Sequence, residues 1–213
     1  MMSPTTLIFD LDGTLIDSAL VVADILNEMR VERGMSPLDI ASYRLWSSLG
    51  GTTLVGNALG IDPAQAADRV VEFRRRYHLR PTPAESLFPT TRQTLTALAA
   101  KDYTMAICSN KPASLCAKVL RETDLADYFD VVIGGDTLPR SKPDPAPLQH
   151  ALAELGVPSD AALMIGDSSV DQRTAAAANV RFVFFTPGYD DGVDRKQAFR
   201  TIDQLSELET VLV

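Results

Sequence analysis

The sequence is short of several features that mark whole classes of protein. It has two cysteines, Cys108 and Cys116, in 213 residues. These are too few for a disulfide framework, so reduced thiols are expected. No run of about 18 apolar residues is present, which argues against a membrane-spanning helix. The opening residues MMSPTTLIFD have neither the basic region nor the apolar stretch of a signal peptide. Together these absences predict a soluble cytoplasmic protein.

Positive charge is also in short supply. The chain has 20 Lys and Arg residues against 28 Asp and Glu residues, a formal net charge of −8. Nucleic acids and anionic membranes are bound through basic surfaces, so neither is expected as a partner. An anionic substrate would have to be held by local positive charge or by a metal ion.

The fold class follows from what is present. With 46% hydrophobic and 23% charged residues, the composition is that of a globular protein, and the length suffices for a core domain and a smaller appendage. Five apolar runs predict strands, at Thr6–Phe9, Thr104–Cys108, Val131–Ile133, Ala161–Ile165 and Phe182–Phe185. Helical patterns alternate with the later runs, at Pro89–Ala100, Pro112–Glu122, Pro145–Leu155 and Ser169–Ala178. This alternation predicts an α/β fold with a Rossmann-like parallel sheet and helices on both faces.

The segment between the first two strands contains helix signals and no convincing strand. The predicted helices lie at Leu20–Arg33, Pro37–Leu49, Thr52–Leu59 and Pro63–Tyr77. Three prolines within Arg80–Pro89 then interrupt the helical pattern. We predict an α-helical cap domain at residues 17–83, inserted into a core domain made of residues 1–16 and 84–213.

Polar side chains follow four of the predicted strands. In open parallel sheets ligands bind beyond the carboxyl ends of the strands, so these side chains should share one site. In chain order they are Asp10, Asp12 and Thr14, then Ser109, Asn110 and Lys111, then Lys142, then Asp167 and Asp171. The side chain of Asn110 could belong to the site or to a local turn.

This set of groups suits phosphoryl transfer. Several carboxylates in one cleft repel each other, and Mg²⁺, which prefers oxygen ligands, would offset their charge. Lys142, the Ser109 hydroxyl and backbone amides at a helix N-terminus could hold a phosphate. One carboxylate of the Asp10–Asp12 pair could be a nucleophile that forms an aspartyl phosphate, and the other a general acid and base.

Four motifs in order, DLDGTLIDS, SNK, SKPDP and GDSSVD, resemble those of the haloacid dehalogenase-like superfamily. Further stretches, LFPTTRQTL, YFDVVIGGDTLPRSKPDPAPL and TPGY, are similar to its phosphoglycolate phosphatases. The resemblance implies Asp10 as nucleophile and Asp12 as general acid and base. It places Ser109 and Lys142 on the phosphate, with Asn110 beside them. It also implies Mg²⁺ held by Asp10, Asp167 and the backbone carbonyl of Asp12, with Thr14 and Asp171 supporting this metal site.

The favoured function is a Mg²⁺-dependent phosphatase of a small phosphorylated metabolite, with 2-phosphoglycolate first among the substrates. Asp12 argues against a metal-independent dehalogenase, which needs no acid there. A phosphonatase would need a cap lysine, and no lysine occurs between Asp17 and Leu98. A receiver domain, at about 120 residues, would have no helical insert. Four alternatives stay open: a sugar-phosphate phosphatase, a pyrophosphatase, a β-phosphoglucomutase-like mutase and a catalytically silent phosphate-binding module. The oligomeric state, monomer or homodimer, also stays open.

Two features of the cap have alternative interpretations. Gly50, Gly51 and Thr52 could form a loop that contacts the substrate or a plain turn between helices. The run Arg74–Arg76 is interpreted as the solvated face of a helix.

Overall fold

A parallel sheet of six strands lies at the centre of the core in the computed structural model, which describes residues 4–47, 49 and 51–212. The strand order is β3-β2-β1-β4-β5-β6. In chain order the strands are β1 (Thr6–Phe9), β2 (Thr104–Cys108), β3 (Val131–Ile133), β4 (Ala162–Gly166), β5 (Arg181–Phe185) and β6 (Arg200–Ile202). The five predicted strands are therefore present, with bounds shifted by one residue in β4 and β5. The edge strand β6 was missed because it is three residues long and two of them are exposed.

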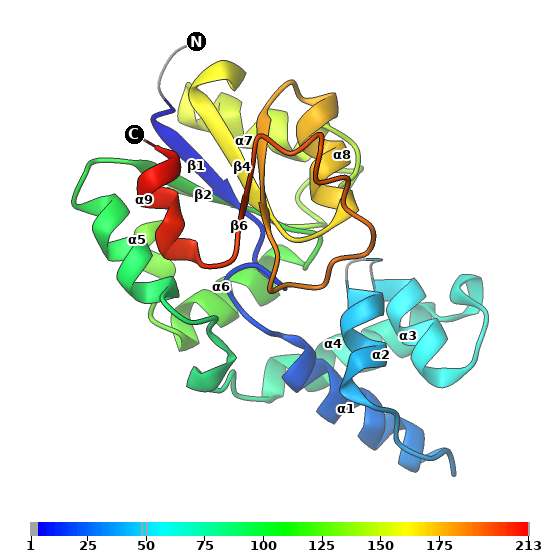
Figure 1. The fold of residues 1–213 in the computed structure, drawn as a ribbon. Coiled ribbons are helices and arrows are strands. Elements are labelled where there is room, and N and C mark those ends of the chain that lie inside the picture. Colours follow the sequence, from blue (N-terminus) through cyan, green and yellow to red (C-terminus); the bar gives the residue numbers. More distant parts are fainter. Residues whose placement is uncertain (1–3, 48, 50, 213) are drawn as a thin grey trace.

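Both faces of the sheet are buried, which explains the nearly continuous apolar strands. Alternate side chains enter two hydrophobic clusters. In β1, Leu7 and Phe9 face the cluster that contains α5 (Thr91–Ala99), α6 (Ala113–Glu122) and α9 (Leu208–Val211). Ile8 faces the cluster that contains α7 (Ala146–Leu155) and α8 (Ser169–Ala177). The predicted α/β architecture with helices on both faces is thus confirmed (Figure 1).

The inserted segment is helical over most of its length. It contains α1 (Ala19–Val31), α2 (Ile40–Ser47), α3 (Gly51–Leu59), a short 3₁₀ turn at Pro63–Gln65 and α4 (Ala67–Leu79). In Figure 1 these helices form a group to one side of the sheet. Helices α1, α3 and α4 pack on one another around buried residues such as Ile25, Val55 and Phe73.

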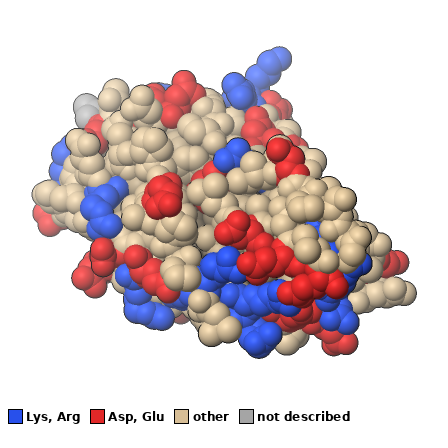
Figure 2. Space-filling view, turned by 90° about the horizontal axis from the view of Figure 1, so that it is seen from below, with Lys and Arg blue, Asp and Glu red and all other residues tan. Residues whose placement is uncertain are grey.

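Ion pairs join α1 to α4 on the outer side of this group. Arg76 binds Glu32 at 2.6 Å, and Arg80 binds Glu28 at 2.7 Å. Figure 2 shows positive and negative side chains intermingled over one part of the face seen from below. Exposed pairs of this kind contribute little to stability individually, so the apolar contacts carry most of the packing of the cap.

The chain passes between the two parts at two adjacent points. Ile16, where the chain leaves the core, forms an antiparallel bridge with Leu87, where it returns. These points lie close to the predicted domain bounds, 1–16, 17–83 and 84–213, which stay a prediction. In the described part of the chain, no helix is both long and apolar enough to cross a membrane.

Candidate active site

Three predicted site residues directly follow three neighbouring strands of the sheet. Asp10 comes after β1, Ser109 after β2 and Asp167 after β4. The backbone amide of Asp10 donates to the carbonyl of Ile165 at 2.9 Å, and that of Ser109 to the carbonyl of Ile133 at 2.9 Å. The hydrogen-bond ladder of the sheet therefore continues into the site and fixes the backbone there.

Lys142 connects two of the carboxylates. Its Nζ lies 3.1 Å from Asp10 Oδ2 and 2.6 Å from Asp171 Oδ1. Burial lowers the pKa of Lys142, but the two carboxylates outweigh this effect and raise it, so the side chain stays an ammonium. Asp171 is itself held at the start of α8, where the Ser168 hydroxyl donates to its Oδ2 at 2.7 Å. Asp171 thus sets the position of the lysine that faces Asp10.

Asn110 holds the backbone of that lysine. Its amide nitrogen donates to the Lys142 carbonyl at 3.0 Å, and its amide oxygen accepts from the Lys142 amide at 2.9 Å. Both polar groups of the side chain are therefore occupied by one peptide segment. A phosphate contact of Asn110 stays a prediction, and the structure shows a role in placing Lys142.

Asp167 lies in a tight enclosure. The Thr14 hydroxyl donates to its Oδ1 at 2.7 Å, and the Tyr189 amide donates to its Oδ2 at 2.7 Å. Gly13 has a φ of +82°, and a Cβ there would lie 2.2 Å from Asp167 Oδ2. A Cβ on Gly188 would lie 2.2 Å from the Cβ of Asp167. The glycine of DLDGT and the glycine of TPGY are thus both required by the close approach of this carboxylate.

Asp12 has a separate partner. Lys111 Nζ lies 2.9 Å from Asp12 Oδ1 and 3.1 Å from Asp12 Oδ2. The same ammonium lies 4.3 Å from the ring centroid of Tyr77, which belongs to cap helix α4. Burial lowers the pKa of Lys111, but Asp12 and Tyr77 outweigh it and raise the pKa. The two carboxylates of DLDGT are therefore held by two different lysines.

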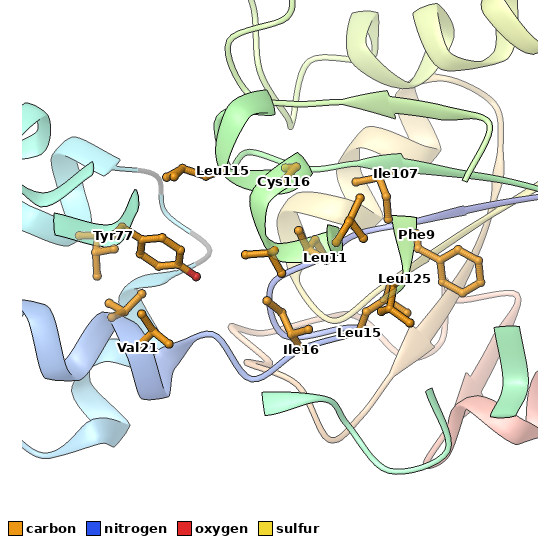
Figure 3. Close-up of a cluster of buried hydrophobic side chains, with 14 of the residues drawn as sticks. Phe9, Leu11, Leu15, Ile16, Val21, Tyr77, Ile107, Leu115, Cys116 and Leu125 are labelled. Atoms are coloured by element: carbon orange, nitrogen blue, oxygen red, sulfur yellow. The ribbon is translucent and has the colours of Figure 1, made fainter. Parts of the chain in front are cut away.

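Tyr77 is a cap residue that reaches this part of the core. Figure 3 shows its ring on the cap side of the buried cluster, with the hydroxyl directed toward the core residues. The side chain is buried, and burial raises the pKa of its hydroxyl while the nearby Lys111 ammonium opposes this effect. Lys111 and Tyr77 together link Asp12 to the cap.

The charges of the site fit a hard divalent cation. Carboxylate oxygens of Asp10, Asp167 and Asp171 lie within 4.8 Å of one another. Burial raises the pKa of Asp10 to about 6, against the opposing effect of Lys142. Burial and the neighbouring carboxylates Asp171 and Asp10 also raise the pKa of Asp167. With Asp12 included, four carboxyl groups face two ammonium groups, so ionisation of all four leaves an excess of two negative charges. Oxygen donors with this charge are typical of a Mg²⁺ or Ca²⁺ site.

Asp10 and Asp167 are the better candidates for metal ligands. Both oxygens of Asp171 are engaged, because Oδ1 binds the Lys142 ammonium and Oδ2 accepts from both the amide and the hydroxyl of Ser168. Each oxygen of Asp167 accepts one hydrogen bond and keeps a lone pair for a cation.

A cavity of about 80 Å³ lies between Asp10, Asp12 and Lys142 of the core and the cap. The core contributes Asp10, Asp12, Ser109, Asn110, Lys111 and Lys142, and the cap contributes residues that include Val22, Gly51, Leu54, Phe73, Arg74 and Tyr77. Gly51 and Thr52 begin α3, whereas Gly50 lies outside the described residues. The cavity is small, charged at its core side and mostly apolar at its cap side.

Comparison with known proteins decides the family. A family model described as haloacid dehalogenase-like hydrolase matches residues 7–185. The chain belongs to this family. A protein from Rhodospirillum rubrum named phosphoglycolate phosphatase is 40% identical to this hydrolase over 195 residues, covering 87% of this chain and 81% of that protein. Another of that name, from Pseudomonas putida, is 36% identical and covers 96% and 78%.

Solved structures agree with this assignment of the hydrolase. The crystal structure of a predicted phosphoglycolate phosphatase from Haemophilus somnus superposes with a TM-score of 0.87 at 25% identity, over 100% of both chains. The family and fold predicted from the four motifs are thus confirmed.

The structure of this hydrolase also shows contacts and site residues that the sequence did not assign. The sequence places Lys111 at the site but does not predict its contact with Asp12. Tyr77 and Arg74 come from the cap, where a helical pattern does not reveal which residues face the core. Tyr189 follows the last long strand, and the TPGY stretch was its only sequence signal.

Proposed function

We propose that this hydrolase removes the phosphate from 2-phosphoglycolate in two displacements through an aspartyl phosphate on Asp10. The observation that carries the proposal is the separation of the two carboxylates of DLDGT. Asp10 faces Lys142 at 3.1 Å, and Asp12 faces Lys111 at 2.9 Å. Two carboxylates in two environments suit two different roles.

In the first displacement a carboxylate oxygen of Asp10 attacks phosphorus as the bond from phosphorus to the glycolate oxygen breaks. Asp12 gives a proton to that oxygen, and glycolate leaves. In the second displacement Asp12 takes a proton from a water molecule that attacks phosphorus. The bond to Asp10 then breaks and inorganic phosphate is released. Lys111 contacts both oxygens of Asp12 and so restrains the orientation of the general acid and base.

Lys142 and Ser109 hold the phosphoryl oxygens in this proposal. Lys142 is buried beside Asp10, and the Ser109 side chain lines the same cavity. Asp171 and Asn110 keep Lys142 in place, and Thr14 keeps Asp167 in place. In this proposal these three residues do not contact the substrate; each one holds a side chain of the site in its place.

We assign Mg²⁺ as the metal, held by Asp10, Asp167 and the backbone carbonyl of Asp12. When bound, it supplies positive charge that offsets the negative charge of the carboxylates and of the phosphoryl group. The charge excess of the carboxylates supports this assignment.

The substrate assignment is supported by the name of the relatives and by the size of the cavity. A two-carbon phosphorylated acid is among the smallest natural phosphomonoesters. Cytoplasmic location stays part of the proposal, supported by the free thiols of Cys108 and Cys116.

A ranked substrate screen tests the proposal. Phosphorylated metabolites would be compared by kcat/KM with Mg²⁺ present, including 2-phosphoglycolate, sugar phosphates and pyrophosphate, with glucose 1-phosphate followed for conversion to the 6-phosphate. The proposal expects 2-phosphoglycolate to rank first. A sugar phosphate or pyrophosphate in first place would overturn the substrate. Isomerisation without net phosphate release would indicate a mutase, and no turnover of any phosphomonoester would indicate a silent binding module.

A further inference from the structure

Arg74 is a cap cation that lines the catalytic cavity without a carboxylate partner among the described residues. The other cations of the cavity are neutralised, since Lys142 contacts Asp10 and Asp171 and Lys111 contacts Asp12. Arg74 is exposed, so water solvates its guanidinium in the free protein, and its place on the cavity wall leaves it available to an anionic ligand.

Its neighbours on α4 are placed differently. Arg69 and Arg76 both bind Glu72, at 3.0 and 2.7 Å. Arg75 lines a separate hollow on the outer side of the cap, together with Glu28 and Leu79. Of the four arginines of this helix, Arg74 is thus the one that borders the catalytic cavity.

Helix geometry explains this placement. The buried residues Val70, Phe73 and Tyr77 form the stripe of α4 that faces the rest of the molecule. Arg74 lies four residues after Val70 and three before Tyr77, so it stands at the border of this stripe. A Cβ on Gly51 would lie 3.7 Å from Arg74 Nη2. The guanidinium therefore lies beside the start of α3, where glycine leaves space.

We propose that Arg74 binds a second anionic group of the substrate, a carboxylate, and thereby selects short phosphorylated acids over neutral phosphomonoesters. The inference rests on the proposed phosphatase function and deepens it. The planar fork of arginine matches a carboxylate with two parallel hydrogen bonds. Lys142 of the core would then hold the phosphate end of a short phosphorylated acid, and Arg74 of the cap would hold its carboxylate end.

The test compares two substrates that differ by the carboxylate. One is 2-phosphoglycolate, and the other is ethyl phosphate, which has the same two carbons and no second anionic group. The variants are Arg74→Gln, Arg74→Lys and, as a matched control, Arg75→Gln on the outer side of the same helix.

The inference expects Arg74→Gln to lower kcat/KM for 2-phosphoglycolate by about 10- to 100-fold, mainly through KM, because a hydrogen-bonded charge pair is lost. For ethyl phosphate the change should stay within about twofold. Arg74→Lys should recover part of the loss, since it keeps the charge without the fork. Arg75→Gln should match the wild type with both substrates.

Three results would overturn the inference, and they separate it from the proposed function. An equal loss with both substrates would mean that Arg74 supports the site in general. An unchanged preference for 2-phosphoglycolate in Arg74→Gln would remove Arg74 as the selecting residue while the proposed function stands. A wild-type enzyme that hydrolyses neither compound would refute the proposed function, and the role of Arg74 with it.

Discussion

The core and the cap contribute to the cavity in different ways. From the core come buried or partly buried carboxylates and ammonium groups, each held by a partner at 2.6–3.1 Å. From the cap come apolar side chains, the ring of Tyr77 and the unpaired Arg74. A site in which every charged group already has an ion-pair or hydrogen-bond partner is preorganised for chemistry. A surface with one free charge and apolar walls is suited to selecting the substrate. We therefore propose that the core carries out the reaction and that the cap selects the substrate.

The largest effect should come from the nucleophile in the core. Asp10→Asn should lower kcat by at least about 10⁴-fold with every phosphomonoester, because the amide cannot form the acyl phosphate. Initial rates with 2-phosphoglycolate and ethyl phosphate would measure it. Asp130 is an exposed acid that directly precedes β3, at the opposite end of the strands from the site. Asp130→Asn is therefore the matched control and should behave as wild type. More than a few per cent of activity in Asp10→Asn would refute the nucleophile assignment.

Metal removal should come next. EDTA should lower kcat by at least about 10³-fold, and Mg²⁺ should restore it, because the excess charge of the carboxylates then opposes binding of the phosphate. In thermal unfolding, Mg²⁺ should raise the Tm of the wild type and leave that of Asp167→Asn unchanged. Full activity in EDTA, or an equal rise in Tm in the variant, would speak against the proposed metal site.

A smaller effect is expected at the contact between core and cap. Lys111→Met should lower kcat by about 10- to 100-fold for both substrates, because Asp12 loses the partner that orients it. Tyr77→Phe keeps the ring over Lys111 and removes only the hydroxyl, so it is the matched control and should change kcat by less than about threefold. If Lys111→Met affected 2-phosphoglycolate alone, Lys111 would belong with Arg74 in substrate selection.

The smallest effect concerns stability rather than rate. Because burial raises the folded-state pKa of Asp10 to about 6, folded metal-free protein retains a proton there that the unfolded chain has already lost above about pH 4. The free energy of unfolding should therefore fall as the pH rises from about 4 to 6, by on the order of 2 kcal/mol from this group. Urea unfolding of the metal-free wild type and of Asp10→Asn at pH 4 and 6 would measure it. The pH-dependent loss should be smaller in the variant, and equal losses would show that Asp10 is not the source.

Much of the core could be predicted from the sequence because its signals are local. An apolar strand that ends in a polar residue identifies both the strand and the site residue, which is why Asp10, Ser109 and Asp167 were found. The strand β6 was missed because an exposed edge strand has no apolar run. Helix α9 (Leu208–Val211) was missed because one helical turn is too short for a periodic pattern.

Contacts between distant segments could not be predicted in the same way. The pairing of Lys111 with Asp12 and Tyr77 joins three parts of the chain, 99 residues apart in the first case. Arg74 shares its sequence run with Arg75 and Arg76, and only the packing of α4 separates their environments. In this protein the sequence therefore identifies the groups of the reaction better than those of substrate selection.

The most direct test of the account is to identify the phosphorylated residue. The wild-type enzyme would be quenched in acid during turnover of 2-phosphoglycolate, reduced with borohydride and analysed by peptide mass spectrometry. Reduction converts an aspartyl phosphate to homoserine. The account predicts homoserine at position 10 and unmodified aspartate at position 12. Homoserine at position 12, or at neither position in an enzyme that is turning over, would contradict it.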